Sequence, residues 1–320
     1  LPLSFREYWY STIPKCYALL DMQPLDAAGI ITLQNYPTLQ LMGDGIMIGF
    51  LDTGIDYQNR VFRNLDGTTR IVGIWDQTIQ TGRTPQGLYY GTEYTEEMIN
   101  AALRSEDPLQ IVPSVDTDGH GTFVASAAAG GAEVGKRFLG AAPEASIAMV
   151  KLKPAKNYLK EFFVIAQDAV CYQENDIMLG LRYLNDLARK QGMPLVICVA
   201  LGTSFGGHNG DSLLADILDI YATVRNRCVV VGTGNEAARR HHYFNRFTDA
   251  QDMRTAEIRV GEGTQSFAVE LWSTLPNIVM VSVTSPSGER TGMIPIRLGY
   301  LFDFLFTFER TTITVEYRLF

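Results

Sequence analysis

The chain has 320 residues, 46% of them hydrophobic, which is enough for one large core or for two domains. Its net charge is −8 and its basic residues cluster nowhere beyond Arg239-Arg240, so the composition excludes an obvious nucleic-acid partner. No apolar run approaches the roughly 18 residues of a membrane span. The sequence starts at Leu1 without the charged and apolar segments of a signal peptide, so it leaves the cellular location open.

The first part of the chain reads as an arm. Pro2, Pro14 and Pro24 break any long element there, and residues 25–29 are compatible with one short helical turn. We therefore expect residues 1–35 to form an N-terminal arm that packs on the main domain. The α/β domain itself is predicted over residues 36–254.

The first clear element is a short apolar run at residues 45–51, bounded by glycines, which predicts a buried strand. Asp52 follows directly, and an acid at the carboxyl end of a buried strand lies where α/β sheets place their sites. Residues 70–76 predict a second strand and residues 77–92 a glycine-rich loop. Residues 95–103 predict a helix with two acids in its first turn, as the helix dipole favours.

A histidine then lies between two glycines at residues 119–121, after an acidic loop and before a run of small residues. The small residues 125–129 predict a closely packed helix that Gly130 ends, with His120 in its first turn. Taken alone, this pattern is also typical of a loop histidine ahead of a core helix. We interpret the nearby Asp56 and Asp118 as structural.

The next segments alternate strands with helices. Strands are predicted at 146–152 and 195–201 and again at Cys228, and helices at 176–189 and from 211 or 212 to 224. Asn175 is predicted to cap the first of these helices and Gly192 to end it. The second helix has its apolar residues on one side, namely Leu213, Ile217, Ile220 and Val224. This alternation predicts an α/β fold with a doubly wound, mostly parallel sheet.

From about residue 255 the pattern becomes β-rich. Residues 267–272, 278–283 and 311–317 predict strands, and the last of them alternates polar with apolar residues, so that one face is solvated. We expect an antiparallel unit over residues 255–320. The four cysteines form no Cys-x-x-Cys pair, so a disulfide framework or a zinc site is not predicted. Cys198 and Cys228 lie in apolar runs and are interpreted as small buried hydrophobes.

Three short motifs follow one another with an aspartate, a histidine and an asparagine in that order. They are Asp52-Thr53-Gly54, His120-Gly121-Thr122 and Gly234-Asn235-Glu236. In order and local context they resemble the subtilisin-like serine proteases, the subtilase family. The likeness runs from about residue 46 to residue 235, and it is greatest to the clostridial subtilases that include the spore-germination proteases. It implies a subtilisin-like fold, with residues 255–320 as part of a jelly-roll-like insertion between the asparagine and serine motifs.

The resemblance also implies roles. His120 would be the general base, Asp52 the carboxylate that orients it, and Asn235 a side-chain donor to the oxyanion. Leu201 and Gly202 match the segment with which subtilases pair substrate backbone, although Ala200 replaces the family's serine. The alternative for Asp52 is a turn-capping carboxylate, and for Asn235 a turn residue in a left-handed conformation.

The nucleophile is the missing part. In the family the serine follows the asparagine, in a Gly-Thr-Ser motif that opens a helix. The one Gly-Thr-Ser of this chain ends at Ser204, precedes Asn235 and runs into Phe205-Gly206-Gly207, which does not begin a helix. We therefore expect the chain to stop inside the insertion and the serine to lie beyond residue 320.

Two functions are compatible with these motifs. The first is a serine endopeptidase that hydrolyses protein or peptide substrates, which the clostridial likeness implies could include a zymogen, with the enzyme's own prodomain as a further partner. The alternative is an inactive pseudoprotease that serves as a binding or regulatory module. Calcium is the one cofactor that the resemblance allows, but no dense acidic loop is present, and we predict no metal ligands. His241 and His242 are adjacent, which is not zinc spacing.

Overall fold

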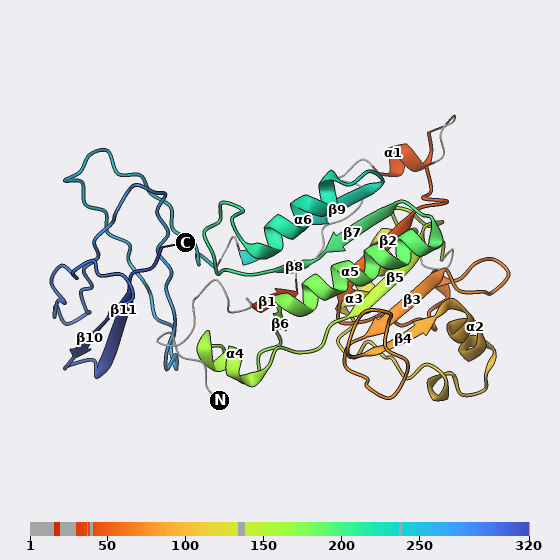
Figure 1. The fold of residues 1–320 in the computed structure, drawn as a ribbon, viewed down its shortest axis with the longest axis horizontal. Coiled ribbons are helices and arrows are strands. Elements are labelled where there is room, and N and C mark those ends of the chain that lie inside the picture. Colours follow the sequence, from red (N-terminus) through yellow and green to blue (C-terminus); the bar gives the residue numbers. More distant parts are fainter. Residues whose placement is uncertain are drawn as a thin grey trace.

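The structure is a computed structural model that describes residues 16–19, 30–36, 38, 41–133, 138–236 and 239–319. Its central sheet has six strands: β2 Met47–Asp52, β3 Ile71–Asp76, β4 Thr92–Thr95, β5 Ser146–Lys151, β7 Leu195–Val199 and β9 Arg227–Val231. Their order is β4-β3-β5-β2-β7-β9, and all neighbours are parallel except β3 and β4 (Figure 1). The predicted α/β fold with a mostly parallel sheet is confirmed.

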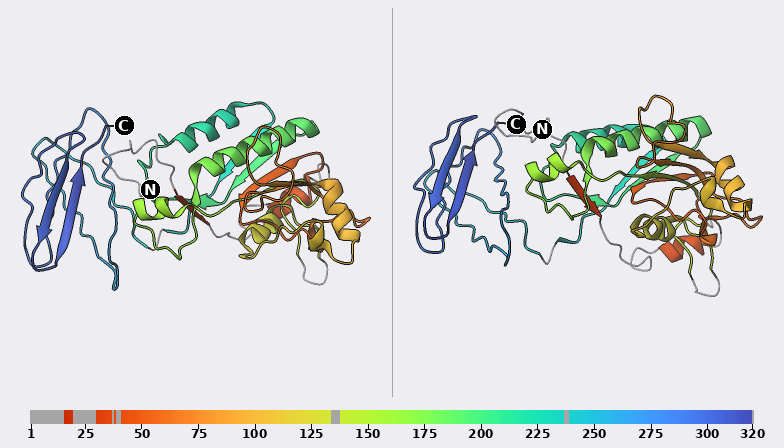
Figure 2. Two further views of the ribbon diagram at one scale, coloured as in Figure 1. Left: turned by 60° about the horizontal axis from the view of Figure 1, so that its bottom comes forward. Right: turned by 90° about the horizontal axis from the view of Figure 1, so that it is seen from below.

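The helices cover both faces of this sheet. They are α1 Ile30–Gln34, α2 Glu96–Arg104, α3 His120–Ala129, α4 Asn157–Phe162, α5 Glu174–Gln191 and α6 Leu213–Thr223, with short 3₁₀ turns η3 Arg60–Phe62 and η4 Pro108–Gln110. Figure 2 shows α5 and α6 along one face, with α2 and α3 on the other. This is the doubly wound arrangement that the alternation of strands and helices predicts.

Strand β2 supplies both cores because successive side chains of a strand point to opposite faces. Met47 and Leu51 pack in the cluster under α5, whereas Ile48 and Phe50 pack in the cluster with α3. All four side chains are buried, and each contributes about 1.5–3 kcal/mol from leaving water. The last residue of this doubly buried strand, Asp52, is thereby placed at the carboxyl edge of the sheet.

Helix α5 begins two residues earlier than predicted. Its N-cap is Gln173, and Asn175 lies inside the first turn, so the prediction that Asn175 caps the helix is wrong. The chain passes into the helix directly from strand β6, Tyr172–Gln173, which leaves no room for a separate cap. Gly192 ends the helix as predicted, with a left-handed φ of 67° that glycine adopts without strain.

Helix α6 begins after Ser212, whose side chain accepts a hydrogen bond from the N–H of Ala215 at 3.1 Å. The apolar side predicted for it faces solvent over most of its length, since Leu213, Ile220 and Val224 are exposed. The helix buries Leu214 instead. Of the predicted side only Ile217 packs partly on the same core, as do Leu218 and Tyr221. The helix lies over β9, which is the edge strand of the sheet. Because the sheet ends there, only part of the helix surface has strands beneath it. For the same reason Cys228 is exposed, not buried as predicted.

The strand predicted at residues 195–201 divides at Ala200. Its second piece, β8 Leu201–Gly202, leaves the central sheet and joins a small antiparallel sheet in the order β6-β1-β8. The central strand of that sheet is β1 Cys16–Leu19, from the N-terminal arm. Farther along the arm, Gln34 Nε2 in α1 donates to the Gly140 carbonyl at 2.6 Å, as packing of the arm on the domain predicts. The helical turn predicted at residues 25–29 lies outside the described residues.

The C-terminal region, residues 255–319, lies at the end of the molecule opposite α2 (Figure 1). Its regular structure is an antiparallel hairpin of β10 Leu301–Phe306 and β11 Thr311–Glu316. The strand predicted at residues 311–317 is therefore present, but residues 267–272 and 278–283 are not in strands. The second of these runs makes only scattered backbone contacts, from the N–H groups of Thr291 and Ile294 to the carbonyls of Val283 and Val281. The jelly-roll-like insertion stays a prediction.

Candidate active site

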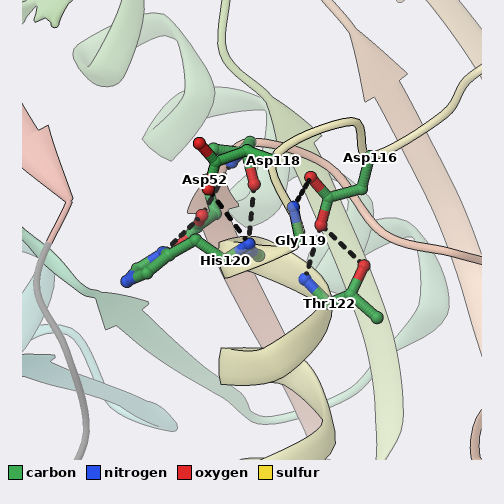
Figure 3. A network of polar contacts seen from close by, with 8 residues as sticks. Asp52, Asp116, Asp118, Gly119, His120 and Thr122 are labelled. Atoms are coloured by element: carbon green, nitrogen blue, oxygen red, sulfur yellow. Dashed lines mark hydrogen bonds and ion pairs between the residues drawn. The ribbon is translucent and has the colours of Figure 1, made fainter. Parts of the chain in front are cut away.

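Asp52 and His120 meet at the carboxyl edge of the central sheet. His120 Nδ1 lies 2.8 Å from Asp52 Oδ1 and 3.1 Å from Oδ2 (Figure 3). The contact predicted from the sequence is thus present. Because an ionised carboxylate only accepts hydrogen bonds, Nδ1 is the nitrogen that carries the proton in the neutral ring, and Nε2 is the one with basic character.

Both groups are largely shielded from water. The side chain of Asp52 is 1% exposed and that of His120 is 14% exposed. Asp52 Oδ1 also accepts the N–H of Thr53 at 2.7 Å. A charge-assisted hydrogen bond in such surroundings is stronger than the same bond in water, so the imidazole is held in one orientation.

The start of α3 is fastened by Asp116, a residue that the sequence motifs did not single out. Asp116 accepts the N–H of Gly119 at 2.9 Å, and from Thr122 it accepts the N–H at 2.9 Å and the hydroxyl at 2.6 Å (Figure 3). Burial opposes its ionisation, but these hydrogen bonds outweigh burial and hold the pKa of Asp116 below its ordinary value. An acid three residues ahead of a helix N-cap is the signal that could have identified it.

Asp118 and Asp56 serve the same helix start. Asp118 Oδ1 accepts the backbone N–H of His120 at 3.3 Å, and the N–H of Asp56 donates to Thr122 Oγ1 at 2.9 Å. These contacts are in line with their structural interpretation. Together with Asp116 they orient the first turn of α3, and therefore His120.

The Asp-Thr-Gly and His-Gly-Thr motifs are in direct contact. The N–H of Gly121 donates to Thr53 Oγ1 at 2.8 Å, and a Cβ built on Gly121 would lie 2.2 Å from the carbonyl oxygen of Gly54. No other residue fits there without moving the helix away from the strand. The close approach that brings His120 to Asp52 thus depends on the glycine of the His-Gly-Thr motif.

The charge of Asp52 also acts on two further side chains. Burial, with a further contribution from the charge of Asp52, raises the pKa of the Tyr172 phenol and raises the pKa of Cys198 to about 11. Cys198 is therefore a neutral thiol at neutral pH and not a nucleophile.

Leu201 and Gly202, predicted to pair with substrate backbone, form β8 beside this site. Their strand edge is occupied in the structure by the chain's own N-terminal arm, since Ala18 pairs with Gly202 and Leu19 with Leu201 in antiparallel register. The other side of β1 pairs with β6. The two-residue strand thus pairs with backbone of the same chain, and its pairing with substrate stays a prediction.

The remaining predicted residues lie on exposed loops. Asn235 follows the carboxyl end of β9, and Ser204 lies between β8 and α6, nine residues ahead of the first residue of that helix. Ser204 thus does not open a helix, in agreement with its rejection as nucleophile. Within the ranges that the structure describes, no group of three or more His, Cys, Asp or Glu side chains could hold a metal ion, and no helix is long and apolar enough to cross a membrane.

Comparison with known proteins points to one family. A family model described as the Subtilase family matches residues 43–291. The CspB protease of Clostridium perfringens is similar in structure, with 31% sequence identity and a TM-score of 0.71, and the match covers 90% of this chain and 55% of that one. The S41 psychrophilic protease has 22% identity over 67% of this chain and 53% of its own, but its TM-score of 0.38 is too low for an argument. No curated protein matches.

Proposed function

The chain belongs to the subtilase family, and we propose that it supplies the acid and the base of a serine endopeptidase with an Asp-His-Ser triad. The observation that carries this proposal is the hydrogen bond between Asp52 and His120 Nδ1, buried at the carboxyl edge of the sheet. The substrates are proteins or peptides, because the family's chemistry is peptide-bond hydrolysis.

The proposed chemistry follows from the His120 tautomer with its proton on Nδ1, because Nε2 is then free to accept a proton. A serine hydroxyl attacks the scissile carbonyl while its proton passes to His120 Nε2, and Asp52 stabilises the imidazolium that forms. The imidazolium then gives the proton to the leaving amine, and water hydrolyses the acyl-enzyme by the same route. We propose that the serine lies outside these 320 residues, because Ser204 leads into a loop and not into a helix.

A serine-directed fluorophosphonate probe tests the function. We expect the folded 320-residue chain to stay unlabelled and the full-length protein to be labelled, since the probe needs a hydroxyl activated by a positioned base. Folding is checked first by a cooperative thermal transition. Labelling of the 320-residue chain that Ser204→Ala abolishes would contradict our placement of the nucleophile. A folded, processed full-length protein that does not react would favour the pseudoprotease.

Asn235 is proposed as an oxyanion donor. In the full-length protein we expect Asn235→Ala to lower kcat by roughly 10²–10³-fold with little change in KM, because the amide acts mainly on the charge that develops in the transition state; this magnitude is the one established for subtilisin itself. Steady-state kinetics on a peptide substrate provide the measurement. A loss carried by KM alone would make Asn235 a binding or structural residue.

We further propose that β1 marks the substrate groove. It lies between β6 and β8 in antiparallel register with both, which is how an extended peptide adds to an exposed strand edge. Residues 16–19 then compete with substrate from within the molecule, the role expected of a prodomain segment.

Proline at position 18 tests this competition. Ala18→Pro removes a ladder N–H from the central strand of the small sheet, whereas Ala18→Gly keeps it and serves as the matched control. We expect kcat/KM of the full-length protein for a short peptide to rise about tenfold or more with proline, because an intramolecular competitor has a high effective concentration. Equal rates for the two variants would show that residues 16–19 do not occupy the substrate groove.

A further inference from the structure

The loop that follows β8, residues 203–212, is joined to the C-terminal region through one carboxylate. Glu270 Oε2 accepts the backbone N–H of Gly206 at 2.8 Å and the indole N–H of Trp272 at 3.0 Å. Gly206 and Glu270 lie 64 positions apart in the sequence. The carboxylate thus connects the loop that follows β8 to the C-terminal region.

The indole ring of Trp272 packs directly on the same loop. A Cβ built on Gly207 would lie 3.1 Å from Trp272 Cε3 and 3.3 Å from Cδ2, closer than an ordinary contact. The ring therefore packs on bare backbone, and the position favours glycine. Glu270 and Trp272 act on adjacent residues of the loop, one by hydrogen bonding and the other by packing.

The loop is also held on other sides. The Phe205 ring lies 4.8 Å from the Phe163 ring, which belongs to a small apolar cluster around α4. The His208 ring lies 4.5 Å from the ring of His242, which follows the loop that carries Asn235. Residues 203–212 are thus a junction at which three parts of the chain meet beside β8.

Strand β8 is too short to set its own position. It consists of two residues, paired with β1 at two positions. A ladder of that length stabilises little by itself. The strand is therefore held by the burial of Leu201 in the main core and by its flanking segments, and Gly202 depends most on the segment that follows it. On one flank Ala200 connects it to β7, which the central sheet holds firmly. On the other flank lies the loop that Glu270 and Trp272 fasten.

We propose that Glu270 and Trp272 are positioning residues for the substrate-binding strand. By holding residues 206 and 207 they set the position in which β8 presents its backbone to an extended peptide, so that the C-terminal region tunes substrate affinity without touching the substrate. This inference rests on the proposed role of β8 as the strand that binds substrate.

The charge of Glu270 makes the attachment sensitive to substitution. Burial raises the pKa of its carboxyl, and the two N–H donors oppose that rise. Hydrogen bonds to a charged group are stronger than neutral ones, so losing this acceptor is expected to shift the local opening equilibrium by about tenfold to a hundredfold.

Amide hydrogen exchange on the folded 320-residue chain is the first measurement. Glu270→Ala is expected to speed exchange at Gly206 about tenfold to a hundredfold and to speed exchange in β8 as well, with β2 unchanged. Glu270→Gln, which keeps one acceptor oxygen, and Trp272→Phe, which keeps most of the ring, are expected to give smaller increases. Glu257→Ala, which removes an exposed carboxylate of the same region, is the matched control.

Kinetics of the full-length protein provide the second measurement. Glu270→Ala is expected to raise KM for a peptide substrate severalfold with kcat little changed, because the triad is untouched. Faster exchange at Gly206 with unchanged β8 exchange and unchanged KM would overturn the proposal, since Glu270 would then be a local loop contact. So would unchanged exchange at Gly206. If the unmodified protein cleaves no peptide, the proposed function fails by itself, and exchange in β8 still decides whether Glu270 positions that strand.

Discussion

Replacing His120 with alanine in the full-length protein is expected to lower kcat for peptide hydrolysis on the order of 10⁶-fold, the magnitude established for the corresponding change in subtilisin. The physical reason is that, in the proposed mechanism, the imidazole of His120 takes the proton of the nucleophile. His120 begins α3, and Asp52, the N–H contact with Asp118 and the close packing of Gly121 together determine its position. Loss of the imidazole therefore removes that base.

The measurement is steady-state hydrolysis of a peptide, combined with fluorophosphonate labelling of the same samples. His241→Ala is the matched control, because His241 is an exposed histidine whose ring pairs with Glu236 and not with Asp52. A cooperative thermal transition confirms that each variant is folded. If His120→Ala reduced the rate no more than His241→Ala, the proposed role of His120 as base would be wrong.

Asp52→Asn is expected to lower kcat about 10⁴-fold while leaving the fold intact, the magnitude being that known for this change in another serine protease. Asparagine fits the same space, but its amide group donates where the carboxylate accepts. It would then favour the ring tautomer with the proton on Nε2, which cannot accept a proton from serine. The hydrogen bond from the N–H of Thr53 to Oδ1 can persist with an amide oxygen, so the loss is one of chemistry and not of structure.

This prediction can be checked on the 320-residue chain as well as on the full-length protein. The ¹⁵N chemical shifts of the His120 ring report which nitrogen carries the proton, and we expect the proton to move from Nδ1 to Nε2 in Asp52→Asn. Asp56→Asn is the control, because Asp56 follows the same strand and its carboxylate accepts only the exposed N–H of Gln58 among the contacts found. An unchanged tautomer with an unchanged rate would indicate that Asp52 is a turn-capping carboxylate.

The sequence by itself was sufficient for the fold class and for the pairing of Asp52 with His120. The fold class follows from the alternation of strands and helices. The pairing was implied by the resemblance of the two motifs to subtilases, with the buried strand that ends in an acid and the small-residue helix that begins with a histidine as its local basis. In a parallel sheet the carboxyl ends of strands come to one edge, so the strand that ends in Asp52 places that residue where α/β sheets have their sites. The close contact of Gly121 with Gly54 explains why the two motifs occur as a pair.

Other features were decided only by the tertiary structure. Which side of α6 is buried depends on how much sheet lies beneath it, and the periodicity of the helix alone favoured Leu213, Ile220 and Val224, which are exposed. In the C-terminal region, strands form where β10 and β11 pair with each other, and not at the apolar run 267–272. The insertion of β1 between β6 and β8, and the bond from Glu270 to Gly206, join segments far apart in the chain. The periodicity of apolar residues in a segment indicates which of its sides faces a core. It carries no information about which distant backbone group forms a hydrogen bond with that segment.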